Sequence, residues 1–355
     1  MKIFHIITLS ALGGAQSVVA NLASEQSKEN EVYIISGIGG DAWKYLNPSI
    51  NIIIIPQLRR DISILDFVVL IKLLIYRIKY KPNVVHLHSS KIGLIGRLAF
   101  SRKKTIYTVH GFDSMRIANR KLLFLEKLLK NKVFKIVGVS KYDLNNLNKE
   151  GIINNTQCIY NGIDDKSLTD KKKDPKIETA LHSITENYSK IIISIARDSA
   201  PKRIDLFFEV AKLMPDLAFV WIGNDKNYIN KPSNAFLFGQ LPNASLYLPY
   251  ADVFMLASDF EGLPISIIEA FSFCKPVVAS NVGGISELLD NMNGFAVENI
   301  VEEFLSKIDL IISNKKSLEL YGSNARSTYL KKFTLSQMAS AYQKLYMQII
   351  EKSIS

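Results

Sequence analysis

One continuous stretch, residues 252–287, constrains the fold of this chain most strongly. It begins with a short apolar run, residues 252–257, which has the length and the branched side chains of a buried strand. A glycine and a proline then mark a turn, and the spacing of the apolar residues predicts a helix over residues 265–273. A second apolar run starts at Val277. Strand, helix and strand in this order predict one unit of a parallel sheet.

Two glutamates of this stretch lie where a ligand could reach them. Glu261 is expected at the carboxyl end of the first strand and Glu269 inside the helix. Ligands of open parallel sheets bind outside the carboxyl ends of the strands. Helix N-termini favour anions, and carboxylates suit hydroxyl groups, so we expect a ligand with both groups, a nucleotide-sugar. The alternative is that Glu261 only caps the helix and that Glu269 is a solvated residue.

The alternation of strands and helices extends along the chain of 355 residues, which is long enough for two domains. It predicts α/β domains with doubly wound parallel sheets and a boundary near residue 165, where a polar, lysine-rich segment begins. The expected strands lie at residues 2–8, 31–36, 52–55, 84–88, 105–110, 133–140, 191–197, 218–222, 235–238, 252–257 and 277–279. The main expected helices lie at residues 17–25, 62–78, 119–132, 206–213, 265–273, 304–312, 315–329 and 336–350.

Other candidate residues lie on loops between a strand and a helix. Arg197 and Lys202 flank a turn that opens a helix, where a guanidinium and an ammonium group would hold a diphosphate. In the first half, a Gly-Gly pair after the first strand lets a ligand approach the backbone, and His110 ends another strand. The alternatives are two exposed basic residues, a tight turn and a structural histidine.

The run of strand, Glu-Gly-Leu-Pro at 261–264, Glu269, strand and Gly-Gly-x-x-Glu at 283–287 resembles the signature of family 4 of the retaining glycosyltransferases, or glycosyl transferases group 1, of the bacterial polysaccharide-biosynthesis type. The resemblance implies the GT-B fold, with two Rossmann-like domains facing a central cleft. It implies an acceptor-binding domain at 1–165, a nucleotide-sugar-binding domain at 166–335, and a final helix at 336–355 that crosses back to the first domain.

The resemblance also implies a function. We expect a hexosyltransferase-type enzyme that moves a sugar, with retention, from a nucleotide-sugar, by family habit a UDP-sugar, to a hydroxyl of a lipid-linked or surface-polysaccharide glycan. The expected catalytic residues are His110, Arg197, Lys202 and Glu261. The expected donor-binding residues are Gly13, Gly14, Gly239, Gly262, Leu263, Glu269, Gly283 and Gly284. No D-x-D motif is present, and fixed cations can replace a metal, so we expect neither a metal nor another cofactor.

Two positions depart from the family pattern. Gln16 stands where the family usually has an acidic residue after its Gly-Gly loop, and Arg203 stands where a glycine usually follows the lysine. Arg203 could crowd its loop or add a third cation. These departures keep open a non-catalytic subunit that binds nucleotide-sugars or membranes. A nucleotide-sugar 2-epimerase on the same fold is the other alternative.

The net charge of +11 favours an anionic partner. Nucleic acid is not expected, because no zinc-finger or RNA-binding motif is present. The basic helix expected at 119–132 could be a solvated surface or could dock on an anionic membrane. Without a signal peptide, a cytoplasmic location is expected, with the inner face of the membrane as a variant. His86 and His88 share one face of a strand, but the sequence offers no third ligand for a metal.

Overall fold

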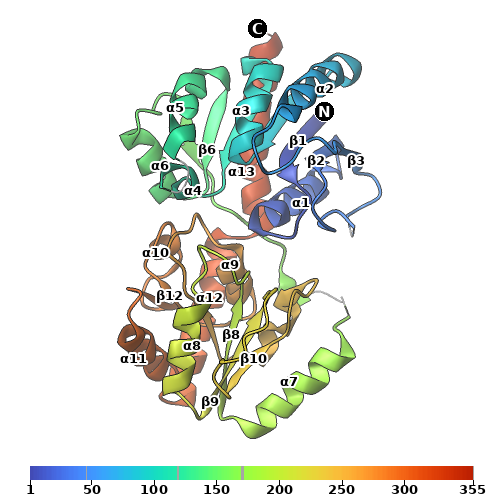
Figure 1. Ribbon diagram of the computed structural model, residues 1–355. Coiled ribbons are helices and arrows are strands. Elements are labelled where there is room, and N and C mark those ends of the chain that lie inside the picture. Colours follow the sequence, from blue (N-terminus) through green and yellow to red (C-terminus); the bar gives the residue numbers. More distant parts are fainter. Residues whose placement is uncertain (45, 118–119, 169–171, 355) are drawn as a thin grey trace. The chain divides into compact units, whose positions relative to one another are not determined.

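The computed structural model describes residues 1–44, 46–117, 120–168 and 172–354. The chain divides into two compact units (Figure 1). Unit 1 comprises Met1–Asp164 together with Leu335–Ser355, and unit 2 comprises Asp165–Thr334. Asn119, where the sequence predicts that a helix starts, lies outside the described residues.

Unit 1 contains a sheet of seven strands in the order β3-β2-β1-β4-β5-β6-β7, and all its pairings are parallel. The strands are β1 (Lys2–Leu9), β2 (Glu31–Gly37), β3 (Asn51–Ile54), β4 (Val84–His88), β5 (Thr105–Val109), β6 (Lys135–Gly138) and β7 (Thr156–Cys158). The strand order reverses direction between β1 and β4. In such sheets the ligand crevice lies outside the carboxyl ends of the strands at this switch point.

Both faces of this sheet are covered, because side chains alternate between faces along a strand. Phe4 and Ile6 of β1 belong to a large apolar cluster that includes Val69 of α2 (Leu65–Tyr80). Ile7 belongs to a second cluster with Val19 of α1 (Gly14–Gln26). The remaining helices of unit 1 are α3 (Ser90–Ala99), α4 (Asp113–Arg116), α5 (Arg120–Leu129), α6 (Lys141–Lys149) and α13 (Leu335–Ile354), with short 3₁₀ turns η1 (Arg102–Lys104) and η2 (Lys130–Lys132).

Unit 2 contains a sheet of six parallel strands in the order β10-β9-β8-β11-β12-β13. The strands are β8 (Lys190–Ile195), β9 (Leu217–Ile222), β10 (Ala235–Leu237), β11 (Val253–Leu256), β12 (Val277–Ser280) and β13 (Gly294–Val297). Counted from β8, this is the same order as in the first six strands of unit 1, with the switch point between β8 and β11. The expectation of two doubly wound parallel sheets is therefore confirmed.

The helices of unit 2 are α7 (Pro175–Asn187), α8 (Ile204–Leu213), α9 (Ile265–Ser272), α10 (Ile285–Leu288), α11 (Val301–Ile312) and α12 (Lys315–Lys332), with 3₁₀ segments η3 (Lys166–Leu168) and η4 (Ala244–Tyr250). Phe207, Phe219 and Trp221 form the aromatic centre of its core. Across the described part of the chain, no helix combines the length and the apolarity that crossing a bilayer requires.

Candidate active site

The structure brings two of the predicted catalytic residues into direct contact. Lys202 lies on the loop between β8 and α8, and Glu261 lies on the loop between β11 and α9. The Nζ of Lys202 forms an ion pair with Oε1 of Glu261, and the two side chains are only 15% and 12% exposed. Ser258 Oγ donates a hydrogen bond of 2.7 Å to the same carboxylate oxygen. The ion pair therefore lies at the carboxyl edge of β8 and β11, the switch point of this sheet.

The two loops are also joined through their backbones. Lys202 and Ser258 form an antiparallel bridge. The N–H of Asp259 donates to the carbonyl of Pro201 at 2.9 Å, and the N–H of Arg203 donates to the carbonyl of Ala257 at 3.0 Å. These bonds hold the two loops in one register, so the ion pair is fixed by the backbone as well as by its own charges.

The sequence did not indicate the side chains that hold the Glu261 loop from behind. Ser280 Oγ accepts from the N–H of Ser258 at 2.8 Å and donates to Asn299 Oδ1 at 2.5 Å. Asn299 Nδ2 in turn donates to the carbonyl of Ser258 at 2.9 Å. This closed ring of hydrogen bonds fixes Ser258. The sequence gives one signal for this ring. Ser280 ends β12, and Ser258 and Asn299 each lie two residues after a strand.

Arg197 lies two residues after the end of β8, on the same loop as Lys202. Its side chain is exposed, and it forms no ion pair with any residue that the structure describes. Arg203 differs, because its guanidinium donates to both carboxylate oxygens of Asp205 at 2.7–3.0 Å and to Asp259 at 3.3 Å. Its charge is thus balanced by Asp205 at the start of α8 and by Asp259 on the loop between β11 and α9.

Glu269 lies in the second turn of α9 and is partly exposed. Burial of its carboxyl group raises its pKa to about 7, while the charge of Lys166 and a hydrogen bond with Ser245 act in the opposite direction. A carboxyl with this pKa is present in both protonation states near neutral pH. It can therefore accept from a hydroxyl group or donate to one.

Of two glycines of unit 2 that were predicted to bind the donor, Gly283 lies where a side chain would not fit and Gly284 contacts the loop that carries Glu261. Gly283 has φ +60°, and a Cβ there would lie 1.8 Å from the carbonyl oxygen of Glu261. The N–H of Gly284 donates to the carbonyl of Gly262 at 2.8 Å. This N–H therefore stabilises the glutamate loop in the ligand-free chain. Leu263 is buried next to it, at 4% exposure.

Gly239 lies after β10 with φ +68°, and open space lies where its Cβ would be. Its N–H donates to Asn224 Oδ1 at 2.8 Å, and its carbonyl accepts from the N–H of Gly223 at 2.6 Å. The loops after β9 and β10 are thus joined at the same edge of the sheet. Backbone around Gly239 therefore stays accessible at this edge.

In unit 1, Gly13 precedes α1 and Gly14 is its first residue, so both lie at the carboxyl end of β1. The departure at Gln16 has a structural role, because its Nε2 donates to the carbonyl of Leu9 at 3.0 Å. His110 directly follows β5, and Gly111 has φ +106°. Burial lowers the pKa of His110 to about 4, so its imidazole is neutral at neutral pH.

The histidine pair of β4 has a third neighbour that the sequence did not reveal. His5 of β1 pairs in register with His86, and the ring nitrogens of His5, His86 and His88 lie within 4.8 Å of one another. The argument that a third ligand is lacking was therefore wrong. Each ring nitrogen of these three histidines nevertheless has a protein partner at 2.6–3.1 Å. The cluster is thus satisfied by hydrogen bonds within the protein.

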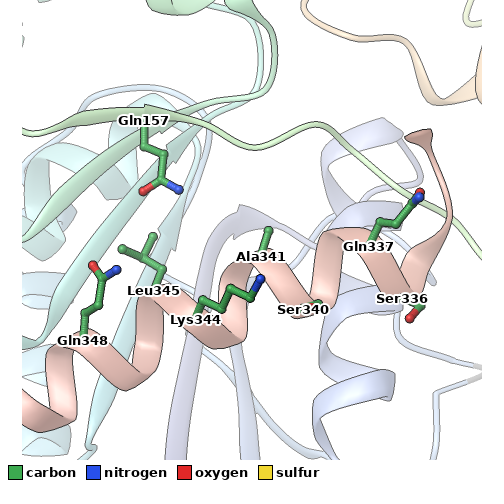
Figure 2. Close-up of a pocket in the computed structure, with 8 residues that line it drawn as sticks. All are labelled: Gln157, Ser336, Gln337, Ser340, Ala341, Lys344, Leu345 and Gln348. Carbon is green, nitrogen blue, oxygen red and sulfur yellow. The ribbon is translucent and has the colours of Figure 1, made fainter. Parts of the chain in front are cut away.

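Two surface grooves contain none of the predicted site residues. One, of about 550 Å³, lies along α13 beside Gln157 of β7 and has Lys344 as its cation (Figure 2). The other, of about 370 Å³, is lined by residues that precede β11 and β12, including Asp252 and Lys275. It therefore lies at the amino ends of those strands, on the opposite edge from the Glu261 loop.

Comparison with solved structures identifies the class of this fold. Anabaena HepE, solved in complex with UDP-glucose, superimposes with a TM-score of 0.79 at 18% identity, covering 99% of this chain and 99% of that chain. Sucrose-phosphate synthase from Thermosynechococcus elongatus superimposes with a TM-score of 0.82 at 17% identity, covering 99% and 100%. The chain therefore has the GT-B fold.

Sequence comparison places the chain in a family. The family model described as Glycosyltransferase Family 4 matches residues 12–167, and the model described as Glycosyl transferases group 1 matches residues 179–328. The chain belongs to this family of glycosyltransferases. An Escherichia coli UDP-Gal:alpha-D-GlcNAc-diphosphoundecaprenol alpha-1,3-galactosyltransferase is 27% identical, over 99% of this chain and 97% of that protein. The capsular polysaccharide biosynthesis glycosyltransferase CapM of Staphylococcus aureus is 26% identical, over 99% and 98%.

Proposed function

We propose that this glycosyltransferase uses a UDP-sugar, acts with retention and without a metal, and extends a lipid-linked precursor of a bacterial surface polysaccharide. The observation that carries the proposal is the Lys202–Glu261 ion pair at the switch point of the unit 2 sheet, with the exposed Arg197 on the same loop as Lys202. The relatives support the substrate class, because one is named for UDP-Gal and a diphosphoundecaprenol acceptor, and HepE was solved with UDP-glucose.

The reaction requires a nucleoside diphosphate to leave the anomeric carbon of the donor sugar. The carbon–oxygen bond breaks with both electrons going to the diphosphate, and the ring becomes oxocarbenium-like. Fixed cations stabilise the charge that develops on the leaving group. Arg197 is exposed and has no acidic partner among the described residues, so it can take one phosphate directly. Lys202 can take the other when the donor displaces part of its contact with Glu261.

The carboxylates then bind hydroxyl groups. Glu261, released in part from Lys202, accepts from hydroxyl groups of the donor sugar, with the backbone of Gly262 and Leu263 beside it. Glu269 binds the ribose hydroxyl groups, and backbone near Gly239 lies against the base. In unit 1, Gly13 and Gly14 leave backbone at the carboxyl end of β1 accessible to the donor. The neutral imidazole of His110 contacts the sugar.

In the transfer step, the acceptor oxygen attacks the same face of the sugar that the diphosphate leaves. A new bond forms between that oxygen and the anomeric carbon, and the proton of the acceptor hydroxyl moves to the departing phosphate oxygen. Retention follows without a covalent enzyme intermediate. Arg197, Lys202 and the N–H of Gly283 supply the stabilising charge, because the N–H of Gly284 already donates to the carbonyl of Gly262. The proposal therefore needs no metal ion.

A lipid-linked acceptor is supported by an exposed apolar stripe on α2. Ile64, Phe67 and Ile78 are 87%, 63% and 73% exposed. The exposed apolar residues recur at intervals of three and four, as one continuous face of a helix does, and they are Ile64, Phe67, Val68, Ile71, Leu74, Ile75 and Ile78. Arg77, Lys79 and Lys81 follow in or just after the last turn, and all are exposed. An apolar face beside cations fits a bilayer with anionic headgroups. Unit 1 would then work at the inner face of the cytoplasmic membrane.

The test is to incubate the purified chain with UDP-Gal, UDP-Glc or UDP-GlcNAc and a synthetic diphosphoundecaprenol-linked sugar, with and without EDTA. We expect acceptor-dependent release of UDP from one donor, unchanged by EDTA, and a product with the donor's anomeric configuration by NMR. A new nucleotide-sugar formed from donor alone would instead support the 2-epimerase. UDP binding without turnover of any acceptor would support the non-catalytic subunit.

A further inference from the structure

A group of polar residues is buried inside unit 1, next to His110. His5 of β1 pairs in register with His86 of β4, and Thr108 of β5 pairs with His88. The side chains of His5, His86 and His88 have no exposed surface. Phe4 and Ile6 flank His5 along the strand and belong to the cluster on the opposite face, so His5 points toward the face that carries α1.

His5, His88 and His110 form a continuous chain of hydrogen bonds that starts at Gln26 of α1 and ends at His110. Gln26, the last residue of α1, contacts His5 Nε2 through its Oε1 position at 2.8 Å. His5 Nδ1 lies 3.0 Å from His88 Nε2. His88 Nδ1 lies 3.1 Å from His110 Nε2. We name His5, His88 and His110 the histidine relay.

His86 forms a separate branch. Its Nδ1 lies 2.6 Å from the hydroxyl group of Tyr346 of α13, and its Nε2 lies 2.6 Å from Thr108 Oγ1. The Tyr342 hydroxyl group lies 3.0 Å from the same Thr108 oxygen. Both nitrogens of His86 are thus used outside the relay. A metal ion at this cluster would have to displace these partners, so we treat the cluster as a hydrogen-bonded network.

The relay rings are neutral, because burial lowers the pKa of His5 and of His110 to about 4 and that of His88 well below its usual value. A neutral imidazole carries one proton, so one nitrogen donates and the other accepts. Each ring of the relay that uses both nitrogens must therefore accept on one side and donate on the other. The tautomer of each ring then fixes that of the next, and Gln26 fixes the first.

The side-chain amide of Gln26 can present its oxygen or its nitrogen to His5. With Oε1 toward His5, the Nε2 of Gln26 is buried and makes no hydrogen bond of good geometry with a described residue, and its neighbour on that side is the hydroxyl group of Tyr346, which can donate as well as accept. Orphaned buried N–H donors are rarer in proteins than carbonyl oxygens with an unfilled lone pair. Half a turn of the amide places Nε2 against His5 and removes the orphaned donor. This orientation makes Gln26 the donor at the start of the relay.

We propose that Gln26 donates to His5 and, through His88, holds His110 in the tautomer that carries its proton on Nδ1. The nitrogen that the relay does not use then presents an N–H. On the proposed function, this N–H binds a hydroxyl or phosphoryl oxygen of the donor while the ring stays neutral. Gln26, His5 and His88 are positioning residues, because they act on the substrate only through His110.

The test uses the full chain labelled with ¹⁵N in histidine, observed by two-bond ¹H–¹⁵N NMR at neutral pH. The chain has five histidines, and His182, which is exposed in unit 2, serves as an internal reference. Protonated and unprotonated ring nitrogens give well-separated signals. We expect the proton on Nδ1 in His5, His88 and His110. A proton on Nε2 in any of the three, or shifts typical of metal ligation, would overturn the proposal.

The variant Gln26→Leu tests transmission along the relay. We expect the ring signals of His110 to change although Gln26 lies three hydrogen bonds away, and kcat/KM for the donor to fall about tenfold. The control Leu22→Ala, a buried residue of the same helix, should leave the His110 ring signals unchanged. A change confined to His5 would refute the relay. Altered His110 signals with unaltered turnover would leave the relay standing and refute the proposed role of His110.

Discussion

Lys202 and Glu261, which are 59 positions apart in the chain, form an ion pair at the carboxyl edge of β8 and β11. Their loops are joined by the bridge between Lys202 and Ser258, so the pair persists in the ligand-free chain without help from a substrate. On the proposed function, this cation and this carboxylate both bind the donor, and in the ligand-free chain they bind each other. Binding a diphosphate at Lys202 requires this contact to loosen, which leaves Glu261 ready for a hydroxyl group.

This arrangement predicts opposite effects of Glu261→Gln on two measurements. The variant removes the charge that competes for Lys202, so UDP alone should bind several-fold more tightly by calorimetric titration. Turnover of the UDP-sugar should fall by about 10²–10³, because the carboxylate no longer orients the sugar.

Glu209→Gln is the matched control, since Glu209 is an exposed residue of α8 in the same unit. It should change neither value. Weaker binding of UDP to Glu261→Gln would show that the carboxylate supports the phosphate site rather than competing for it.

Arg197→Ala should abolish most of the activity without unfolding the protein. Arg197 is exposed and has no acidic partner within the described residues, so its loss should not alter the melting temperature. Loss of one fixed cation at the leaving group should lower kcat by about 10²–10³. Lys212→Ala, which removes an exposed cation from the last turn of α8, should retain full activity. Full activity of Arg197→Ala would exclude its role at the phosphate.

Most strands of both sheets could be predicted from the sequence, because parallel strands buried on both faces read as continuous apolar runs. Helix α3 is absent from the sequence expectation. Its two glycines lower helix propensity, yet the structure needs both of them. A Cβ at Gly93 would lie 2.6 Å from the Tyr107 ring, and one at Gly96 would lie 2.4 Å from Leu87. Close packing of the helix on the sheet therefore outweighs local propensity.

The sequence predicted which residues lie at the candidate site, but it did not predict which of them contact one another. Strand ends placed Arg197 and Glu261 at one edge of a sheet, since the carboxyl ends of parallel strands meet there. The pairing of Lys202 with Glu261 depends on the register of two loops, which no local pattern encodes. The contact of His5 with His86 and His88 likewise follows from strand register, because residues 5 and 86 meet only when β1 pairs with β4.

The apolar stripe of α2 predicts binding to anionic vesicles. The double variant Phe67→Ser, Ile75→Ser removes two exposed apolar side chains, each of which would contribute about 1.5–3 kcal/mol if fully buried in the bilayer. Binding to phosphatidylglycerol-containing vesicles, measured by co-sedimentation, should fall at least tenfold. Leu310→Ser, at an exposed leucine of α11 in unit 2, should have no effect. Equal binding of wild type to neutral vesicles would contradict the electrostatic part of the argument.

The raised pKa of Glu269 predicts how stability depends on pH. Burial raises this pKa from 4.5 to about 7, against the opposing effects of Lys166 and Ser245. Between these pH values the folded chain holds a proton that the unfolded chain releases. The contribution of Glu269 to the free energy of unfolding is therefore fully present below pH 4.5 and is lost as the pH rises through about 7.

Glu269→Gln keeps the shape of the side chain and cannot ionise, so it lacks this dependence. The melting temperature of the variant relative to wild type should therefore increase steadily in thermal unfolding scans between about pH 5 and pH 8. Glu302→Gln, an exposed glutamate in the first turn of α11, should show no such trend. Parallel curves for Glu269→Gln and wild type would mean that the carboxyl of Glu269 titrates normally. It would then be ionised at neutral pH, and would bind a ribose hydroxyl group only as an acceptor.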